Sequence, residues 1–435
     1  MPAILRLLCV GAGGTALCAC AGTGQSGDES WRSVWKDAPV TAQQVIEIRS
    51  VAGVRAIPRA DQVSAPPVVA YGDGADSRLC GKTPEGPLHV SFDAALPDGL
   101  DPKFVLTAGG AILVEGTSRW ALFSSDGAPR AAGVKAAGVL RLQPERNLCL
   151  APNRSGTLTA FDLSDGSPKF DVALTFGAAY ERRMIALANG VLRVASVERT
   201  LDPHAGIAPR QFLLEVRNLT DQRGEGLAAG EVLTEPIADL TGESRHFACA
   251  LRRGQWTFAV DNAICRVDES CALTVQWNGA FEPRFLSVDE AGRMYLLARV
   301  ERRMELWLVR SDGGRVYAAP ISDDAGEPIA PPIVGYGHVA YVLTRSHAAA
   351  VDQTGELLWS CKPAGPVAGA GVTADDHLLI AAGGELGWID PKGAWQTLYD
   401  FGPRSVRTPP VLTERGDVLL ATDERLYALT TKPPE

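Results

Sequence analysis

The sequence predicts an all-β protein, an eight-bladed β-propeller of four-stranded antiparallel blades. A unit of strand, Asp-Gly type turn and second strand returns along the chain, most clearly at residues 159–170, 306–317 and 350–359. These turns recur roughly every 44 residues, which is the spacing of propeller blades. The second strand of a unit, such as 377–382, is an apolar run, as expected for a sheet buried on both faces between neighbouring blades.

Composition fits one large globular domain of this kind. The chain has 435 residues, of which 46% are hydrophobic and 21% charged. Because each repeat adds to one continuous core, a chain of this length need not divide into several domains. The net charge of -9, with no basic patch, argues against a nucleic-acid partner, since such proteins neutralise phosphates with clustered Lys and Arg.

The first forty residues predict export and a lipid anchor. Arg6 precedes an apolar run, residues 7–17, that is shorter than the roughly 20 residues of a membrane span and is typical of a signal peptide. The run ends in Leu17-Cys18-Ala19-Cys20, which resembles the bacterial lipobox. That resemblance implies a signal peptide at 1–19, an acylated Cys20 and a flexible tether over 20–40, followed by the propeller over 41–435. The alternative is an ordinary cleaved signal peptide. Ala21 resembles the pattern of Gram-negative lipoproteins sent to the outer membrane, facing the periplasm or the cell surface.

Cysteine usage agrees with export. Six of the nine cysteines remain after the signal region, and an even number in an exported protein permits disulfides without fixing their pairing. Cys265 and Cys271 flank a short hairpin turn, so we expect their β-carbons to lie near each other and to form a disulfide. Two packed thiols are the alternative.

The turn after the third strand of each unit counts the blades. These turns fall near Asp126, Asp165, Asp221, Asp268, Asp312, Thr354, Lys392 and Thr431. The widest gap contains a Pro- and Gly-bearing loop at 199–210 inserted into one blade. Eight turns predict eight blades; seven is the alternative, if the 165–221 region is less regular than the rest.

The last unit has only three strands, so an N-terminal strand must close the ring, or an open edge would remain. Two segments are candidates for this strand, 87–92 and 45–49.

The repeat resembles the pyrroloquinoline-quinone-like (PQQ-like) propeller repeat, whose signature is Ala-x-Asp-x-x-Thr-Gly-x-x-x-Trp. Residues 350–359 keep Ala350, Asp352, Thr354, Gly355 and Trp359 but are one residue shorter, and residues 160–170 keep the spacing with Asp165 for Thr and Phe170 for Trp. The resemblance covers roughly residues 100–432 and implies the fold. In such a repeat Gly permits the tight turn and the aromatic packs on the adjacent blade. The tryptophans that we therefore assign to packing before ligand binding are Trp120, Trp277, Trp307, Trp359, Trp388 and Trp395.

Chemistry-bearing motifs are scarce. The six histidines are scattered, with no His-x-His or His-x-x-x-His spacing, and no nucleophile elbow or phosphate-binding loop occurs. Quinoprotein dehydrogenases of the resembling family carry an adjacent Cys-Cys pair, and no such pair follows the signal region. The sequence therefore predicts no catalytic residue, no metal site and no cofactor.

The leading interpretation is a non-catalytic, lipid-anchored interaction scaffold of the bacterial envelope. It is similar in kind, by architecture and anchor, to the lipoprotein propeller of the outer-membrane β-barrel assembly machinery. We expect a membrane contact through Cys20 and an envelope protein as partner, with 199–210 and 223–236 as the contact region. The alternative is a ligand-binding or enzymatic propeller with a carbohydrate or peptide site in the axial funnel, or a degenerate quinoprotein. A funnel lined by convergent carboxylates, His or Arg would favour the alternative.

Overall fold

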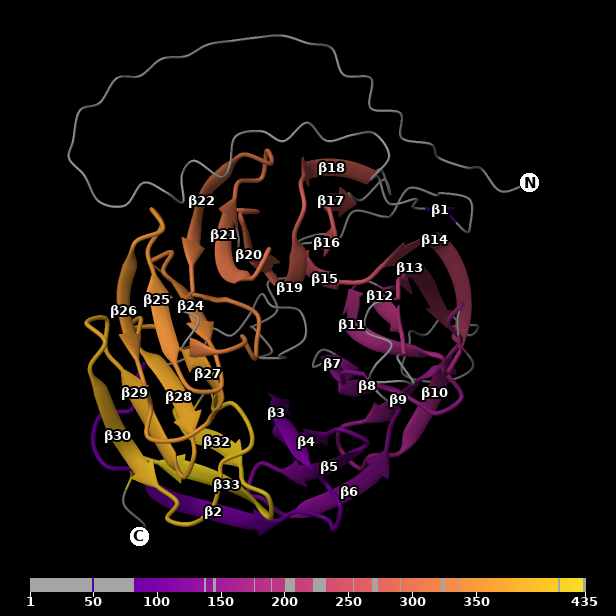
Figure 1. Ribbon diagram of the computed structural model, residues 1–435. Coiled ribbons are helices and arrows are strands. Elements are labelled where there is room, and N and C mark those ends of the chain that lie inside the picture. The colour runs from indigo at the N-terminus through magenta and orange to yellow at the C-terminus, as the bar shows by residue number, and fades with distance from the viewer. Residues whose placement is uncertain are drawn as a thin grey trace, which may run out of the picture.

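The computed structural model describes residues 49–50 and 82–432, except 137, 144–145, 176, 189, 200–207, 222–231, 253, 268–272, 290, 322–324, 336 and 414. Over these residues the chain forms a ring of eight antiparallel sheets around a central axis (Figure 1). No helix among them is long and apolar enough to cross a membrane.

Each blade is numbered from the strand nearest the axis outward. Blade 1 consists of β3 (Pro102–Ala108), β4 (Ala111–Gly116), β5 (Arg119–Ser124) and β6 (Pro129–Val134), and blade 2 of β7 (Arg141–Gln143), β8 (Leu148–Pro152), β9 (Leu158–Asp162) and β10 (Pro168–Val172). Blade 3 consists of β11 (Tyr180–Ala188), β12 (Val191–Glu198), β13 (Arg210–Asp221) and β14 (Val232–Ser244), and blade 4 of β15 (Phe247–Arg252), β16 (Gln255–Val260), β17 (Ala263–Val267) and β18 (Leu273–Asn278). Blade 5 consists of β19 (Glu282–Val288), β20 (Met294–Val300), β21 (Arg303–Val309) and β22 (Arg315–Pro320), and blade 6 of β23 (Ile333–Val334), β24 (Ala340–Leu343), β25 (Ala348–Val351) and β26 (Leu357–Cys361). Blade 7 consists of β27 (Val367–Val372), β28 (Leu378–Ala382), β29 (Glu385–Ile389) and β30 (Trp395–Asp400), and blade 8 of β31 (Val411–Leu412), β32 (Val418–Ala421), β33 (Arg425–Thr430) and β2 (His89–Ala95).

The predicted eight blades are therefore confirmed, and the seven-bladed alternative is wrong. The region between residues 165 and 221, on which that alternative depended, supplies β10 to β13 without a missing strand. Seven of the eight predicted turn positions follow the third strand of a blade, and Asp221 is the last residue of such a strand, β13; Asp268 itself lies outside the described residues.

The predicted N-terminal closure of the ring is also confirmed. Strand β2 is the outermost strand of blade 8 and pairs antiparallel with β33, with Val90 opposite Leu429. It overlaps the candidate segment 87–92. The other candidate, 45–49, does not close the ring: of its residues the structure describes Arg49, which with Ser50 forms β1 (Arg49–Ser50) at the outer edge of blade 3.

Antiparallel order within every blade gives the ring two distinct faces. Connections between first and second strands and between third and fourth strands lie on one face, which we call the turn face because it carries the Asp-Gly type turns. Connections between second and third strands and between successive blades lie on the opposite face, which we call the insertion face because it carries the 199–209 connection and the 321–332 connection.

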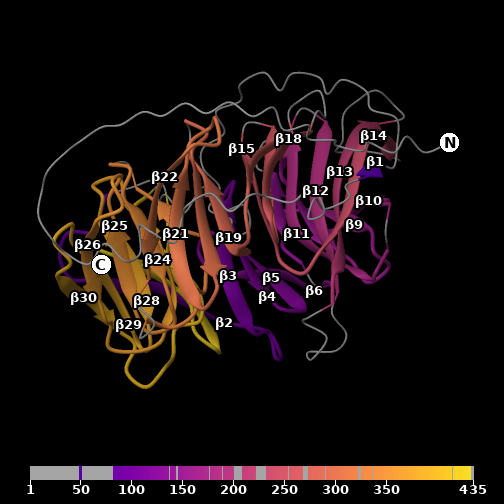
Figure 2. The same cartoon turned by 45° about the horizontal axis from the view of Figure 1, so that its top comes forward.

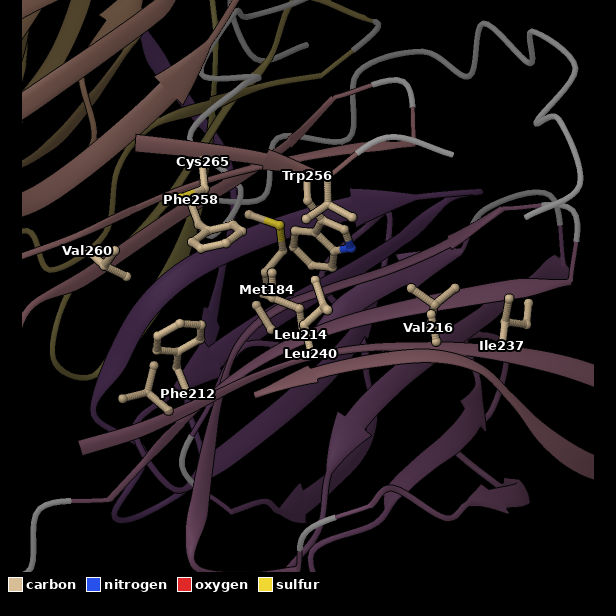
Figure 3. Close-up of a cluster of buried hydrophobic side chains, with 14 of the residues drawn as sticks. Met184, Phe212, Leu214, Val216, Ile237, Leu240, Trp256, Phe258, Val260 and Cys265 are labelled. Atoms are coloured by element: carbon tan, nitrogen blue, oxygen red, sulfur yellow. The ribbon is translucent and has the colours of Figure 1, made fainter. Parts of the chain in front are cut away.

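Apolar side chains fill the spaces between blades. Within the described residues, eight hydrophobic clusters occur, one at each interface between neighbouring blades. Figure 3 shows the cluster between blades 3 and 4, where Phe212 and Leu214 of β13 face Trp256 and Phe258 of β16. The strands therefore carry apolar residues on both faces, which explains why their sequences lack a simple alternation.

The six tryptophans assigned to packing all belong to these clusters or pack against them. Trp120 of blade 1 stacks on Phe161 of blade 2 with ring centroids 4.3 Å apart. Trp277 of blade 4 meets Trp307 of blade 5 edge to face at 4.9 Å. Their role in packing is thus confirmed.

Candidate functional site

Blade 3 departs most from the repeat. Its strands β13 and β14 have 12 and 13 residues, whereas no described strand of another blade is longer than seven. Its strands run side by side in Figure 2, on the side of the ring away from β26 and β30. The predicted contact region belongs to this blade. Most of 199–210 and 223–236 lies outside the described residues. The predicted loop 199–210 ends at Arg210, which begins β13, and residues 232–236 of the second stretch begin β14.

A group of buried charged side chains lies inside blade 3. Glu215 on β13 stands directly opposite Asp239 on β14, and both carboxylates are buried. Two like charges in this position would repel each other. Arg217, two residues along the same face of β13, donates hydrogen bonds to Glu215 Oε1 at 2.8 Å and to Asp239 Oδ2 at 2.9 Å. One guanidinium thus neutralises part of two opposed carboxylates.

Thr175, in the connection from blade 2, completes this buried charge cluster of Glu215, Arg217, Asp239 and Thr175. Its backbone N–H donates to Glu215 Oε1 at 2.6 Å, and its hydroxyl donates to Asp239 Oδ2 at 3.0 Å. Burial raises the pKa of Asp239 from 3.8 to about 6, although Arg217 opposes this shift. The cluster therefore links blade 2 to blade 3 through charged groups. Within it, the carboxylate with the raised pKa is that of Asp239.

A second buried cation, Arg182 of β11, ties three backbone segments together on the insertion face. Its guanidinium donates to the carbonyl oxygens of Gly156 at 2.8 Å and Gly177 at 3.2 Å. Its own backbone pairs with Gly138 and accepts a hydrogen bond from the N–H of Val139. Burial lowers the pKa of Arg182. These contacts have a structural role, because the guanidinium of Arg182 donates hydrogen bonds to backbone carbonyl groups of the same chain.

Blades 1 and 2 are joined in a similar way. Lys135 and Glu115 form a buried ion pair at 3.0 Å, and the N–H of Leu140 donates to the same Glu115 oxygen at 3.1 Å. Burial raises the pKa of Glu115, with Lys135 acting against that change. Ion pairs of this kind specify how two elements meet, and removing one partner leaves an uncompensated buried charge.

Charged side chains also stand where the innermost strands begin, on the insertion face around the ring axis, a region that we call the mouth. Lys103, Arg183 and Arg284 each occupy a β-bulge in the innermost strand of blades 1, 3 and 5. Each pairs with the acidic residue two positions earlier: Lys103 with Asp101 at 2.8 Å, Arg183 with Glu181 at 3.1 Å and Arg284 with Glu282 at 3.4 Å. In each of these mouth pairs the two side chains neutralise each other's charge along one strand. The charged groups of the three pairs do not converge on one point.

His246 occupies the connection between blades 3 and 4 on the same face. Its Nδ1 lies 2.7 Å from Asp261 Oδ1, and its Nε2 lies 3.8 Å from Glu282 Oε2. Burial raises the pKa of Asp261, but hydrogen bonds from His246 and from the N–H of Arg245 outweigh it and hold that pKa below its ordinary value. Both ring nitrogens of His246 are directed at carboxylates of the chain. No group of three or more His, Cys, Asp or Glu side chains suited to a metal ion occurs within the described ranges.

Most of the residues predicted to be lipidated or to form a disulfide lie outside blade 3 and outside the described residues. Cys20 and the tether are outside the described residues, as is Cys271. Cys265 is buried on β17, and burial raises the pKa of its thiol to about 12. The bridge between Cys265 and Cys271 stays a prediction.

Sequence reasoning missed the buried charges of blade 3. The segment Leu213-Leu214-Glu215-Val216-Arg217 alternates apolar and charged residues, which is typical of a strand with one solvated face. In the ring that face is covered by blade 2. The only available signal was the acidic residue on each of two successive strands with a basic residue nearby.

Comparison with known proteins supports the architecture. No protein family profile and no curated protein sequence matches the chain. Among solved structures, BamB from Moraxella catarrhalis is similar with a TM-score of 0.51 and 12% identity over 80% of this chain and 99% of that one. The computationally designed Ika8 protein is similar with a TM-score of 0.51 and 8% identity over 77% and 98%. Virginiamycin B lyase from Staphylococcus aureus aligns with a TM-score of 0.43 and 12% identity over 68% and 95%. At this level of identity the likeness to BamB and Ika8 shows the fold alone, and that fold is the β-propeller.

Proposed function

We propose that the chain is a lipid-anchored propeller of the bacterial cell envelope that acts as a non-catalytic protein-interaction scaffold in outer-membrane assembly. The observation that carries the proposal is the contrast between blade 3 and the rest of the ring. The described strands of the other seven blades have seven residues or fewer, whereas blade 3 has two strands of 12 and 13 residues and an added fifth strand. Such a local departure from a repeat is typical of a contact region on a scaffold.

The charged side chains at the mouth support the same proposal. Its exposed cations are paired with carboxylates two residues away, and His246 lies between two carboxylates. A catalytic site needs groups aimed at one substrate position. The mouth pairs instead distribute their charges around the ring. This arrangement is more typical of a solvated protein surface than of a catalytic site.

The likeness to BamB extends the proposal to a place in the cell. The two chains share a propeller of similar extent, and the lipobox-like segment at residues 17–20 would place this one on a membrane. Architecture does not transfer function by itself. The partner is therefore to be sought by experiment among envelope proteins.

The decisive test is crosslinking of the lipidated protein in native membranes, followed by purification and identification of partners. A variant with exposed blade-3 residues exchanged, Glu235→Arg with Glu243→Arg, should lose a partner that the wild-type chain recovers. A matched variant in blade 7, Gln396→Arg with Asp400→Arg, should keep it. A partner that survives the blade-3 exchange but not the blade-7 exchange would overturn the assignment of the contact region.

The anchor has a separate test. Cys20→Ser should move the protein from the membrane fraction to the soluble fraction, and loss of the acyl chains should be visible in the mass of the N-terminal peptide. Continued membrane association of Cys20→Ser, with an unmodified N-terminal peptide in the wild type, would contradict the lipoprotein proposal.

A ligand-binding or catalytic funnel is the second candidate, and His246 is the observation that favours it. The group of His246, Asp261, Glu282 and Arg284 is the densest set of charged side chains at the mouth. Its test is ligand binding by the wild-type protein from a panel of oligosaccharides and peptides, with His246→Ala and Glu282→Gln as variants. Saturable binding lost in both variants would favour this candidate over the scaffold.

A further inference from the structure

Before β2 closes the ring, the part of the chain that the structure describes contacts blade 3 at β1 and blade 7 at Thr83. The earlier point is β1, which pairs antiparallel with β14, with Arg49 opposite Thr241 and Ser50 opposite Leu240. Blade 3 thereby becomes a five-stranded sheet, whereas the other seven sheets have four strands. Figure 1 shows β1 beside β14 at the outer edge of the ring.

Strand β14 has the burial pattern of an interior strand. Its residues Ile237, Ala238, Asp239 and Leu240 are all buried. No outermost strand of another blade has two successive buried residues among those that the structure describes, and β6 and β26, for example, expose at least every second residue. An edge strand with four successive buried residues is expected to be covered, because an exposed apolar edge invites association with other chains. The pairing with β1 agrees with this expectation.

The later point is Thr83, which is fixed to blade 7. Its N–H donates to Asp375 Oδ1 at 2.8 Å, and its hydroxyl lies 3.0 Å from the buried hydroxyl of Thr373. Both partners belong to the turn between β27 and β28. Blades 3 and 7 are four positions apart in a ring of eight, so the two fixed points lie on opposite sides; both views place β14 and β27–β30 in this way (Figures 1 and 2).

We propose that β1 moors the N-terminal part of the chain at blade 3 and thereby turns that side of the ring toward the lipid surface that holds Cys20. This inference rests on the proposed lipid anchor. Between Cys20 and Arg49 there are 28 residues, and between Cys20 and Thr83 there are 62. Because the longest span of a chain is proportional to its number of residues, mooring at β1 lowers the upper limit of the distance between Cys20 and the ring by a factor of about 2.2. It also moves the attachment point to the opposite side of the disc.

The orientation can be measured on the full lipidated chain in vesicles of phosphatidylethanolamine and phosphatidylglycerol that contain a nitroxide-labelled lipid. A fluorophore is placed on Leu233→Cys in blade 3 or on Gln396→Cys in blade 7, both at exposed positions. The wild-type chain treated in the same way gives the background from natural thiols. Quenching should be stronger at position 233 than at position 396.

Breaking β1 should reverse that order. Arg49→Pro with Ser50→Pro removes both backbone donors and cannot pair with β14. The first contact with the ring that the structure describes is then at Thr83, so quenching should become stronger at position 396. A ratio that favours position 396 in the wild type, or that is the same before and after the proline substitutions, would overturn the proposal.

A disulfide separates failure of the mooring from failure of the anchor. Arg49→Cys with Thr241→Cys places two cysteines directly opposite each other, within the range that a disulfide spans. Mild oxidation should link them in a chain carrying Cys20→Ser as well, whereas Arg49→Cys with Leu233→Cys should not link. Absence of the first link contradicts the mooring itself. If the link also forms in a chain that keeps Cys20, but that chain does not bind vesicles, the result contradicts only the anchor.

Discussion

The ring of Phe92 lies against Gly127, and this contact joins the end of the propeller to its beginning. Phe92 belongs to β2, the closing strand of blade 8, and Gly127 is the turn glycine of blade 1. A β-carbon at Gly127 would lie 2.4 Å from a carbon of the Phe92 ring. Gly355 meets Tyr317 and Gly393 meets Trp359 in the same manner, each pair across a blade interface. The turn glycine is therefore required by the neighbour's aromatic as well as by its own positive φ.

Gly127→Ala should destabilise the ring more than Gly416→Ala. Both glycines have a φ of +84°, but nothing lies within 4 Å of a β-carbon placed at Gly416. Gly416→Ala should cost about 1 kcal/mol through backbone strain alone. Gly127→Ala should cost about 1–3 kcal/mol more because the methyl group collides with Phe92. Urea unfolding of both variants measures the difference, and equal losses would show that the contact with Phe92 imposes no further constraint. In a chain that carries Phe92→Ala, Gly127→Ala should cost less than it costs in the wild type, which tests the pair directly.

Arg217→Met should be among the most destabilising single changes in the protein. It leaves Glu215 and Asp239 opposed and buried without a cation, for which about 3–5 kcal/mol is typical. Arg183→Met is the control, because its guanidinium is half exposed and pairs with Glu181 at the surface, where about 0–1 kcal/mol is expected. Thermal and urea unfolding give the two values. Adding Glu215→Gln and Asp239→Asn to Arg217→Met should restore stability; if the triple variant is as unstable as Arg217→Met, the loss lies in packing and not in charge.

Asp239 should make the stability of blade 3 depend on pH. Its pKa is about 6 in the folded chain and 3.8 when unperturbed, so between these values the folded state binds more protons than the unfolded state. Stability contributed by this group therefore falls as pH rises through that window and is greatest below it. Asp239→Asn removes the dependence. The difference in unfolding free energy between wild type and Asp239→Asn should change between about pH 4 and 6 in favour of the wild type at the acid end.

Removing β2 should open the ring. A chain that begins at residue 96 lacks the outer strand of blade 8 and leaves the edge of β33 uncovered, so it should aggregate and lose its cooperative unfolding transition. A chain that begins at residue 82 keeps β2 together with Thr83 and its contacts to blade 7. It lacks β1 but keeps the closed ring, so it should still unfold in one cooperative transition. A monomeric, cooperative chain beginning at residue 96 would contradict closure by β2.

Much of the fold could be predicted because the repeat is written locally. The turns of blades 1, 2, 5, 6 and 7 each combine a Gly at positive φ with an Asp that accepts backbone hydrogen bonds, and these residues recur in sequence order at similar spacing. Asp352, for example, accepts from the N–H groups of Thr354 and Glu356, as the turn chemistry predicts. The incomplete last unit likewise required an N-terminal strand, since a sheet edge cannot stay open without consequence.

The buried charge cluster could not be predicted from the sequence, for a physical reason. Glu215, Arg217, Asp239 and Thr175 come from two strands and an inter-blade connection up to 64 positions apart. Only the register of β13 against β14 and the approach of blade 2 bring them together. A strand that alternates charged and apolar residues has the same sequence pattern whether water or another blade covers its charged face.

The sequence by itself determined the number of blades, the turns and the need for closure, because all three follow from short-range conformational preferences repeated at a constant interval. The tertiary structure alone decided which N-terminal segment closes the ring, which one joins blade 3, and which charged residues are buried. These choices depend on how the free energies of competing strand pairings and of burying charged groups compare once the ring is assembled, and no local segment contains that comparison.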